Sequence, residues 1–206
     1  MTKDIAIREI TVQDAPMVAA LHIKGIKTGF ISSLGIDFVT ALYEAIAKNK
    51  SSFGFVAEEN DKVLGFIAFT TNLNKLYKSV ITKSGIKFAL LLVGKIFSLK
   101  TIKKVFETLF YPNRIKKLDL PSAELLSIVI DKEQREKGLA TGLVQKGLAK
   151  CARRGIEKVK VLVAADNQSA NKLYKKYGFE LVAQIENHGI LSNIYVAETS
   201  KNVLNE

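Results

Sequence analysis

The chain has 206 residues, of which 48% are hydrophobic, and its net charge is +11 at pH 7. This length and this hydrophobic content suit a single globular domain over residues 1–206 with a sizeable core. One cysteine, Cys151, excludes an internal disulfide, and with the polar start of the chain it leads us to expect a cytoplasmic protein. Two histidines, His22 and His188, without clustered cysteines give no metal-ligand spacing, so we expect no metal.

The part of the chain before residue 72 predicts a strand, two helices and a hairpin. The expected elements are a strand over Asp4–Ile10, a helix beginning at Thr11 or Asp14, a loop over Thr28–Leu34, a helix over Asp37–Lys48, and strands over Phe53–Glu58 and Val63–Thr71. His22 falls on the inner face of the first helix, a position more typical of a packed side chain than of a catalytic base. Gly65 inside a strand indicates a bulge or a close backbone approach.

A basic segment follows from about residue 73 to residue 120. Apolar residues recur there at helical spacing and lysines fill the other side, which predicts one or two amphipathic helices. Residues 75–117 carry +10 of the net charge. The aromatic residues follow the apolar face, so we expect no nucleic-acid contact. Contact with a membrane surface remains an alternative to a helical cover over the sheet or an acceptor pocket.

The centre of the chain combines a buried strand, a basic turn and a helix. Glu124 begins the strand, whose apolar run is Leu125–Ile130, and the helix extends from Leu139 to Arg154. Between them, residues 135–140 have the form Arg-x-x-Gly-x-Ala. The start of a helix presents unpaired N–H groups and a positive dipole end, which suit a phosphate or pyrophosphate. The alternative is an ordinary solvated loop.

A second motif follows the next buried strand, Val159–Ala164. It runs Asn-x-x-Ala-x-x-Leu-Tyr-x-x-x-Gly-Phe from Asn167 to Phe179 and predicts a helix over Gln168–Tyr177. Two strands, over 179–185 and 190–197, complete the chain as a hairpin. The helical crossover makes the two buried strands parallel neighbours.

The two motifs in this order resemble the GNAT superfamily of acyl-CoA-dependent N-acetyltransferases. The resemblance implies an α/β (α+β) fold, with a mixed, mostly antiparallel sheet, a splayed parallel central pair of strands and helices on both faces. The basic segment would then be a helical insertion between the third and fourth strands. Such domains ordinarily have little between these strands, so the resemblance gives the insertion no role.

The resemblance also implies acetyl-CoA as cosubstrate, with its pantetheine arm along the central strand and its pyrophosphate on the amides of the basic turn. The residues expected to bind it are Ile128, Val129, Ile130, Arg135, Glu136, Lys137, Gly138, Leu139, Ala140, Thr141, Asn167 and Tyr174. Tyr174 stands where the family often places its general acid, although helical spacing with Tyr177 also suits a core aromatic. Glu124 is the candidate base, with an ion pair to a lysine of the insertion as the alternative.

Three functions are compatible with these features. The first is acetyl transfer to the primary amine of a small molecule by direct attack, for example on an amino sugar or an acidic metabolite drawn by the basic insertion. The second has a protein or peptide amine as acceptor. Leu162 counts against it, because relatives that acetylate protein N-termini often carry a glutamate there. The third is a non-catalytic acyl-CoA-binding protein whose insertion contacts a membrane or nucleic acid.

Overall fold

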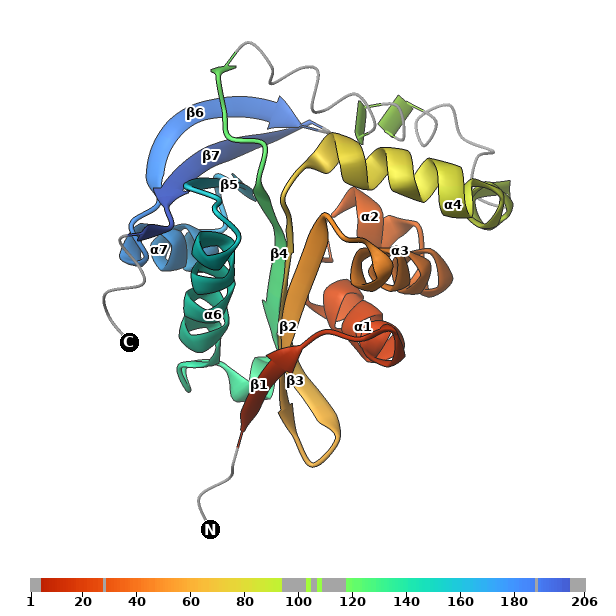
Figure 1. Ribbon diagram of the computed structural model, residues 1–206, viewed down its shortest axis with the longest axis horizontal. Coiled ribbons are helices and arrows are strands. Elements are labelled where there is room, and N and C mark those ends of the chain that lie inside the picture. Colours follow the sequence, from red (N-terminus) through yellow and green to blue (C-terminus); the bar gives the residue numbers. More distant parts are fainter. Residues whose placement is uncertain are drawn as a thin grey trace.

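A mixed sheet forms the centre of the protein, and its strands lie in the order β1-β2-β3-β4-β5-β7-β6 (Figure 1). The computed structural model describes residues 5–27, 29–93, 103–104, 107–108, 118–187 and 189–200. The strands are β1 (Ala6–Glu9), β2 (Ser52–Glu59), β3 (Lys62–Thr70), β4 (Glu124–Ile130), β5 (Lys158–Ala164), β6 (Glu180–Asn187) and β7 (Ile190–Glu198). The helices are α1 (Ala15–Gly25), α2 (Phe30–Ser33), α3 (Ile36–Lys48), α4 (Leu73–Val93), α6 (Leu139–Arg153) and α7 (Gln168–Lys176), with short 3-10 turns η1 (Val12–Asp14) and η3 (Lys132–Gln134).

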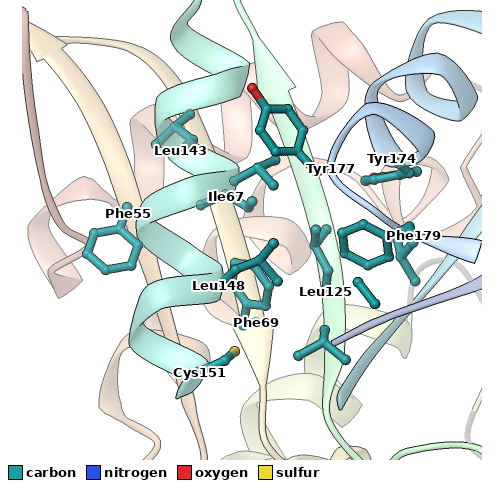
Figure 2. Close-up of a cluster of buried hydrophobic side chains, with 14 of the residues drawn as sticks. Phe55, Ile67, Phe69, Leu125, Leu143, Leu148, Cys151, Tyr174, Tyr177 and Phe179 are labelled. Carbon is teal, nitrogen blue, oxygen red and sulfur yellow. The ribbon is translucent and has the colours of Figure 1, made fainter. Parts of the chain in front are cut away.

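Helices cover both faces of the sheet, as predicted. In Figure 1, α1, α2, α3 and α4 lie on one side of the sheet and α6 and α7 on the other. Each face has its own apolar core. One core joins α6 and the Tyr174 region to the sheet (Figure 2), and the other joins α1, α3 and the start of α4 to the opposite face.

The predicted splayed parallel pair is confirmed. β4 runs antiparallel to β3 along its length, but its parallel register with β5 consists of Glu124 opposite Lys160 and Leu125 opposite Val161. At this point β4 contains a bulge. Leu125 pairs with Phe69 and Ser127 pairs with Ala68, so two adjacent residues of β3 face three residues of β4. Leu126 is the extra residue. A bulge bends its strand and increases the local twist, so β4 leaves β5 where the bulge begins.

The predicted elements are present, with ends that shift by one or two residues. One expectation was wrong: the connector over 28–34 contains the short helix α2. The final hairpin also joins the sheet through its second strand, since β7 lies between β5 and β6. Gly65 has both predicted features, a register shift beside it and a close backbone approach, since an added Cβ would lie 3.1 Å from the carbonyl oxygen of Val129.

The basic insertion begins with α4, which confirms a helix at its start. Residues 94–102, 105–106 and 109–117 of this segment lie outside the described residues, as does the predicted turn residue His188. Within the described residues, no helix is both long enough and apolar enough to cross a lipid bilayer.

Candidate active site

A cavity of about 1630 Å³ opens where β4 and β5 separate. Its wall includes β4 from Leu126 to Ile130 and β5 from Val161 to Ala164. The starts of α6 and α7 line one side, and α1, α2, α3 and α4 line the other. Of the predicted site residues, all of which the structure describes, Lys137 alone is outside the wall. The sequence motifs therefore meet in one place.

The turn from β4 to α6 presents backbone N–H groups to this cavity. Gly138 is the N-cap residue of α6, with φ of +80°, and no side chain caps this helix. The first intrahelical bond at this end is donated by Gly142 N to Gly138 O, at 3.1 Å. The amides of Leu139, Ala140 and Thr141 are therefore left without an intrahelical acceptor, which suits an anionic ligand.

The two basic side chains of the turn differ in their orientation. Arg135 lines the cavity and its Nε lies 3.5 Å from the carbonyl oxygen of Ile130. Lys137 donates from Nζ to Oε1 of Gln134 at 2.9 Å, outside the cavity wall. Lys137 can thus contribute charge near a ligand in the turn, while Arg135 can contact it.

Tyr174 is both a cavity residue and a core residue. It is 4% exposed, and its ring centre lies 5.4 Å from that of Phe179 (Figure 2). Burial raises the pKa of the Tyr174 hydroxyl above its usual value near 10. The difference between the pKa of this phenol and that of the coenzyme A thiol is therefore larger than the sequence alone suggests. The Tyr174 hydroxyl stays protonated and can donate a hydrogen bond.

Asparagines fix the position of α7. Asn167 caps the helix as predicted, accepting from the amide of Ala170 at 3.2 Å. Asn171, which the sequence analysis missed, donates to the carbonyl oxygen of Ala164 at 3.0 Å and accepts from the Tyr195 hydroxyl at 2.9 Å. It therefore ties α7 to the end of β5 and to β7. The sequence signal that could have identified Asn171 is its position one helical turn after the capping residue Asn167.

Glu124 is the first of the two β4 residues that pair with β5. It is 6% exposed, and its Oε2 is 3.4 Å from Nζ of Lys160 on β5. The ion-pair partner in the described part of the chain is thus a lysine of β5, whereas the sequence suggested a lysine of the insertion. Burial raises the pKa of Glu124, and Lys160 opposes that shift. Oε2 accepts no hydrogen bond from the described residues, so it can accept one from a ligand.

A buried polar chain that the sequence did not predict also lies at the cavity. The Tyr43 hydroxyl is 2.7 Å from Nδ1 of His22 and 2.8 Å from Oγ of Ser127. These residues come from α3, α1 and β4, and the bulge at Leu126 accounts for Ser127 facing this side. Burial lowers the pKa of His22 to about 4, so its ring is neutral at pH 7.

No group of three or more His, Cys, Asp or Glu side chains in the described parts of the chain is arranged to hold a metal ion. The polar groups of the cavity include instead backbone amides at the start of α6, the hydroxyls of Tyr43, Tyr77 and Tyr174, and the buried carboxylate of Glu124. This set fits an anionic coenzyme and proton transfer.

Solved structures with the same fold are numerous. An N-acetyltransferase from Staphylococcus aureus Mu50 is 20% identical with a TM-score of 0.62, covering 95% of this chain and 99% of that chain. The ribosomal-protein-S18-alanine N-acetyltransferase of Escherichia coli is 14% identical with a TM-score of 0.61, covering 95% and 94%. NAA60 of Arabidopsis thaliana, solved with acetyl-CoA, is 15% identical with a TM-score of 0.60, covering 95% and 98%.

At these identities the structures establish the fold. No curated protein sequence matches the chain significantly. The model of the acetyltransferase (GNAT) family matches residues 26–179, which is most of the chain and includes both sequence motifs. The chain therefore belongs to the acetyltransferase (GNAT) family and is an acyltransferase, with acetyl-CoA as its cosubstrate.

Proposed function

We propose that the protein transfers the acetyl group of acetyl-CoA to the primary amine of a small molecule by direct attack. The observation that carries this proposal is the opening between β4 and β5 at the Leu126 bulge, where one cavity reaches both faces of the sheet. Such an opening can bring a coenzyme from one side to an acceptor on the other. The family assignment favours catalysis over a non-catalytic acyl-CoA-binding role.

The coenzyme would lie along β4 and end on the first turn of α6. Beyond Leu125 the edge of β4 that faces β5 is free of pairing with it, so the backbone of Ile128–Ile130 can bond the amides of a pantetheine arm. The pyrophosphate would accept from the amides of Leu139, Ala140 and Thr141. Two structures of the same fold, PaiA N-acetyltransferase of Thermoplasma acidophilum and NAA60, were solved with coenzyme A and acetyl-CoA respectively.

The reaction requires one proton acceptor and one proton donor. The amine nitrogen attacks the thioester carbonyl carbon, the carbon–sulfur bond breaks, and the thiolate of coenzyme A leaves. Glu124, whose raised pKa makes it a better base than a solvated carboxylate, takes the proton from the amine. Tyr174 gives its proton, or a hydrogen bond, to the departing sulfur. The products are the acetylated amine and coenzyme A.

A small acceptor is favoured over a protein terminus by the helices that line the acceptor side. α1, α2, α3 and α4 all contribute to the cavity wall there, and α4 packs on α3. Leu162, at the position where relatives that acetylate protein N-termini often carry a glutamate, lines the same cavity. A peptide would need an open groove past these helices.

Thiol release from acetyl-CoA in the presence of a panel of amines tests the role of Tyr174. We expect Tyr174→Phe to lower kcat by about 10²-fold or more, because it removes the proton donor, while coenzyme A binding is unchanged. Tyr177→Phe is a matched control, since Tyr177 lies three residues away, is also buried and is outside the cavity wall. Equal rates for the two variants would contradict the assignment.

The pH profile of the same assay tests Glu124. In the wild type, kcat/KM calculated for the neutral form of the amine should fall on the acidic side as the carboxylate is protonated. Glu124→Gln should lower kcat/KM by about 10²-fold or more and remove this acidic limb. Since the substitution leaves Lys160 without its ion pair, the thermal stability of the variant is measured alongside. A retained acidic limb would show that another group is the base.

A further inference from the structure

The half of the cavity that would receive the acceptor has apolar walls. We call it the acceptor chamber: the part lined by α1, α2, α3, α4 and the face of β4 that carries Ser127. Its large side chains are Phe30, Phe38, Leu42, Leu76, Val80 and Phe88. Leu76 is 2% exposed and Phe88 7% exposed, so α4 turns these residues inward.

Contacts between α4 and α3 hold this wall in place. The rings of Phe38 and Phe88 meet edge to face, with centres 5.0 Å apart. At the surface, Nζ of Lys87 lies 2.8 Å from Oε2 of Glu44. The first helix of the basic insertion is therefore fixed as a side of the chamber, with Leu76, Val80 and Phe88 in the wall and Ile86 and Leu90 exposed on its other side.

The polar side chains of the chamber mostly bond one another. Tyr43 links His22 to Ser127, and Lys160 is placed against Glu124. At the chamber, the buried polar atoms left without a hydrogen bond from the described residues are His22 Nε2 and Glu124 Oε2. An amino sugar would bring several hydroxyl groups and find few partners, and each unpaired buried hydroxyl weakens binding. One amine, in contrast, fits the Glu124 oxygen, which is ion-paired with Lys160 but accepts no hydrogen bond from the described residues.

The size of the cavity allows two ligands at once. Sites for a single small ligand are typically about 300–1,000 Å³, and this cavity is about 1630 Å³. A coenzyme on the α6 side therefore leaves room on the α1–α4 side. That room is bounded mainly by hydrocarbon and aromatic surface, and Lys104, near the Phe30 ring, and the Tyr77 side chain also belong to its wall.

Resting on the proposed function, we infer that the acceptor is an amphiphilic primary amine. Its hydrocarbon tail, aliphatic or aromatic, occupies the acceptor chamber between α1, α3 and α4, and its amino group points to Glu124 at the opening between β4 and β5. This differs from the amino sugar or acidic metabolite that the basic insertion suggested, because α4, the helix that begins the insertion, presents Leu76, Val80 and Phe88 to the chamber.

A series of n-alkylamines from propylamine to octylamine tests this inference, with glucosamine as the polar comparison. Binding is measured by calorimetry on the complex with coenzyme A, and kcat/KM is measured with acetyl-CoA. Both should rise about fourfold for each added methylene, which corresponds to about 0.8 kcal/mol, until the chamber is full. Hexylamine should bind more tightly than glucosamine.

Two substitutions on one helix locate the tail. Val80 lines the cavity and Ile86, 81% exposed, does not. Val80→Asp should abolish the dependence on chain length, and Ile86→Asp should preserve it. If Val80→Asp does not fold, the nearly isosteric Val80→Thr should weaken hexylamine binding several-fold and leave propylamine binding unchanged.

The possible outcomes test the inferred acceptor and the proposed reaction separately. Affinities that do not change with chain length, or tighter binding of glucosamine than of hexylamine, would overturn the inference. Rates that rise with the acyl chain of the donor, with hexanoyl-CoA better than acetyl-CoA, would also overturn it by placing the tail on the donor. Chain-length-dependent binding without acetyl transfer would support the chamber and contradict the proposed function.

Discussion

The two sides of the cavity are built from different parts of the polypeptide. The coenzyme side consists of backbone: one edge of β4, the turn at Gly138 and the first amides of α6, all contained in residues 124–141. The acceptor side consists of side chains from α1, α2, α3, α4 and β4. Its polar chain joins residues 21 and 84 positions apart.

This difference decides what disturbs each side. The coenzyme side depends on a few backbone conformations and on how α6 sits against the sheet, so it should respond to changes at glycines. The acceptor side depends on the packing and protonation of buried side chains, so it should respond to pH and to changes of side-chain volume. Three experiments can separate the two.

The largest expected effect is loss of stability in acid through His22. Its pKa is about 4 in the folded protein and near 6.5 when unfolded, so the unfolded chain binds more protons between these values. The contribution is fully present above pH 6.5 and is lost as the pH falls toward 4. It amounts to about 3 kcal/mol from a pKa difference of this size.

Urea unfolding of wild type and His22→Leu between pH 7 and pH 4 measures this contribution. Other acid-sensitive groups, such as Asp14 beside Arg8, are present in both proteins, so the difference in slope belongs to His22. NMR titration of the imidazole gives the pKa directly, since the chain has two histidines. Parallel pH dependence of the two proteins would show that His22 does not titrate as its burial requires.

A smaller effect is expected where α6 docks on β3, on the coenzyme side. A Cβ at Gly147 would lie 2.2 Å from Cε2 of Phe69, a ring that is fully buried and stacked on Phe53 (Figure 2 shows Phe69 against α6). Gly147→Ala should therefore lower the free energy of unfolding by about 2 kcal/mol, because a rigid core cannot accept the added group.

Gly142→Ala on the same helix is the control. Its Cβ would meet Cδ1 of Ile7 at 2.8 Å, which is the end of a flexible side chain. Alanine also favours a helix over glycine by about 1 kcal/mol, so this variant should be as stable as the wild type or more stable. Denaturant unfolding of both variants measures the difference. Equal stabilities of the two variants would show that the Phe69 ring moves aside and does not limit the packing of α6, and would contradict this prediction.

The coenzyme side could be predicted from the sequence because its motifs are local. Gly138 and Asn167 each lie in the short connection between a buried strand and the next helix, and the cap at Asn167 was predicted with its role. The bulge at Leu126 could not be predicted, because it depends on the register of β4 against β3. The opening between β4 and β5 was expected from the family resemblance, and the bulge is its physical cause.

The acceptor side could not be predicted because its contacts are long-range. His22 was correctly placed on an inner face, but nothing near it in the sequence points to Tyr43 or Ser127. Glu124 was correctly identified as an unusual carboxylate, yet its partner was sought in the charged insertion and not on β5. The distribution of charge along the sequence indicated where lysines gather. That Lys160 is buried beside Glu124 depends on the tertiary structure.

The smallest expected effect concerns the conformation that aims the α6 amides. Gly138 has φ of +80° and Gly155, just beyond the other end of the same helix, has φ of +69°, and an added Cβ meets nothing within 4 Å at either position. Alanine at either position should therefore cost about 1 kcal/mol of stability, from left-handed backbone strain alone. Gly138 lines the cavity and Gly155 does not.

Calorimetric titration with coenzyme A distinguishes the two variants. If the amides after Gly138 hold the pyrophosphate, Gly138→Ala should weaken coenzyme A binding about fivefold, the equivalent of about 1 kcal/mol, because the loop relaxes away from the strained conformation that aims them. Gly155→Ala loses the same stability at a distance from the ligand, so its affinity should equal that of the wild type. Matching affinities for both variants would place the pyrophosphate elsewhere and leave the coenzyme side dependent on side chains such as Arg135.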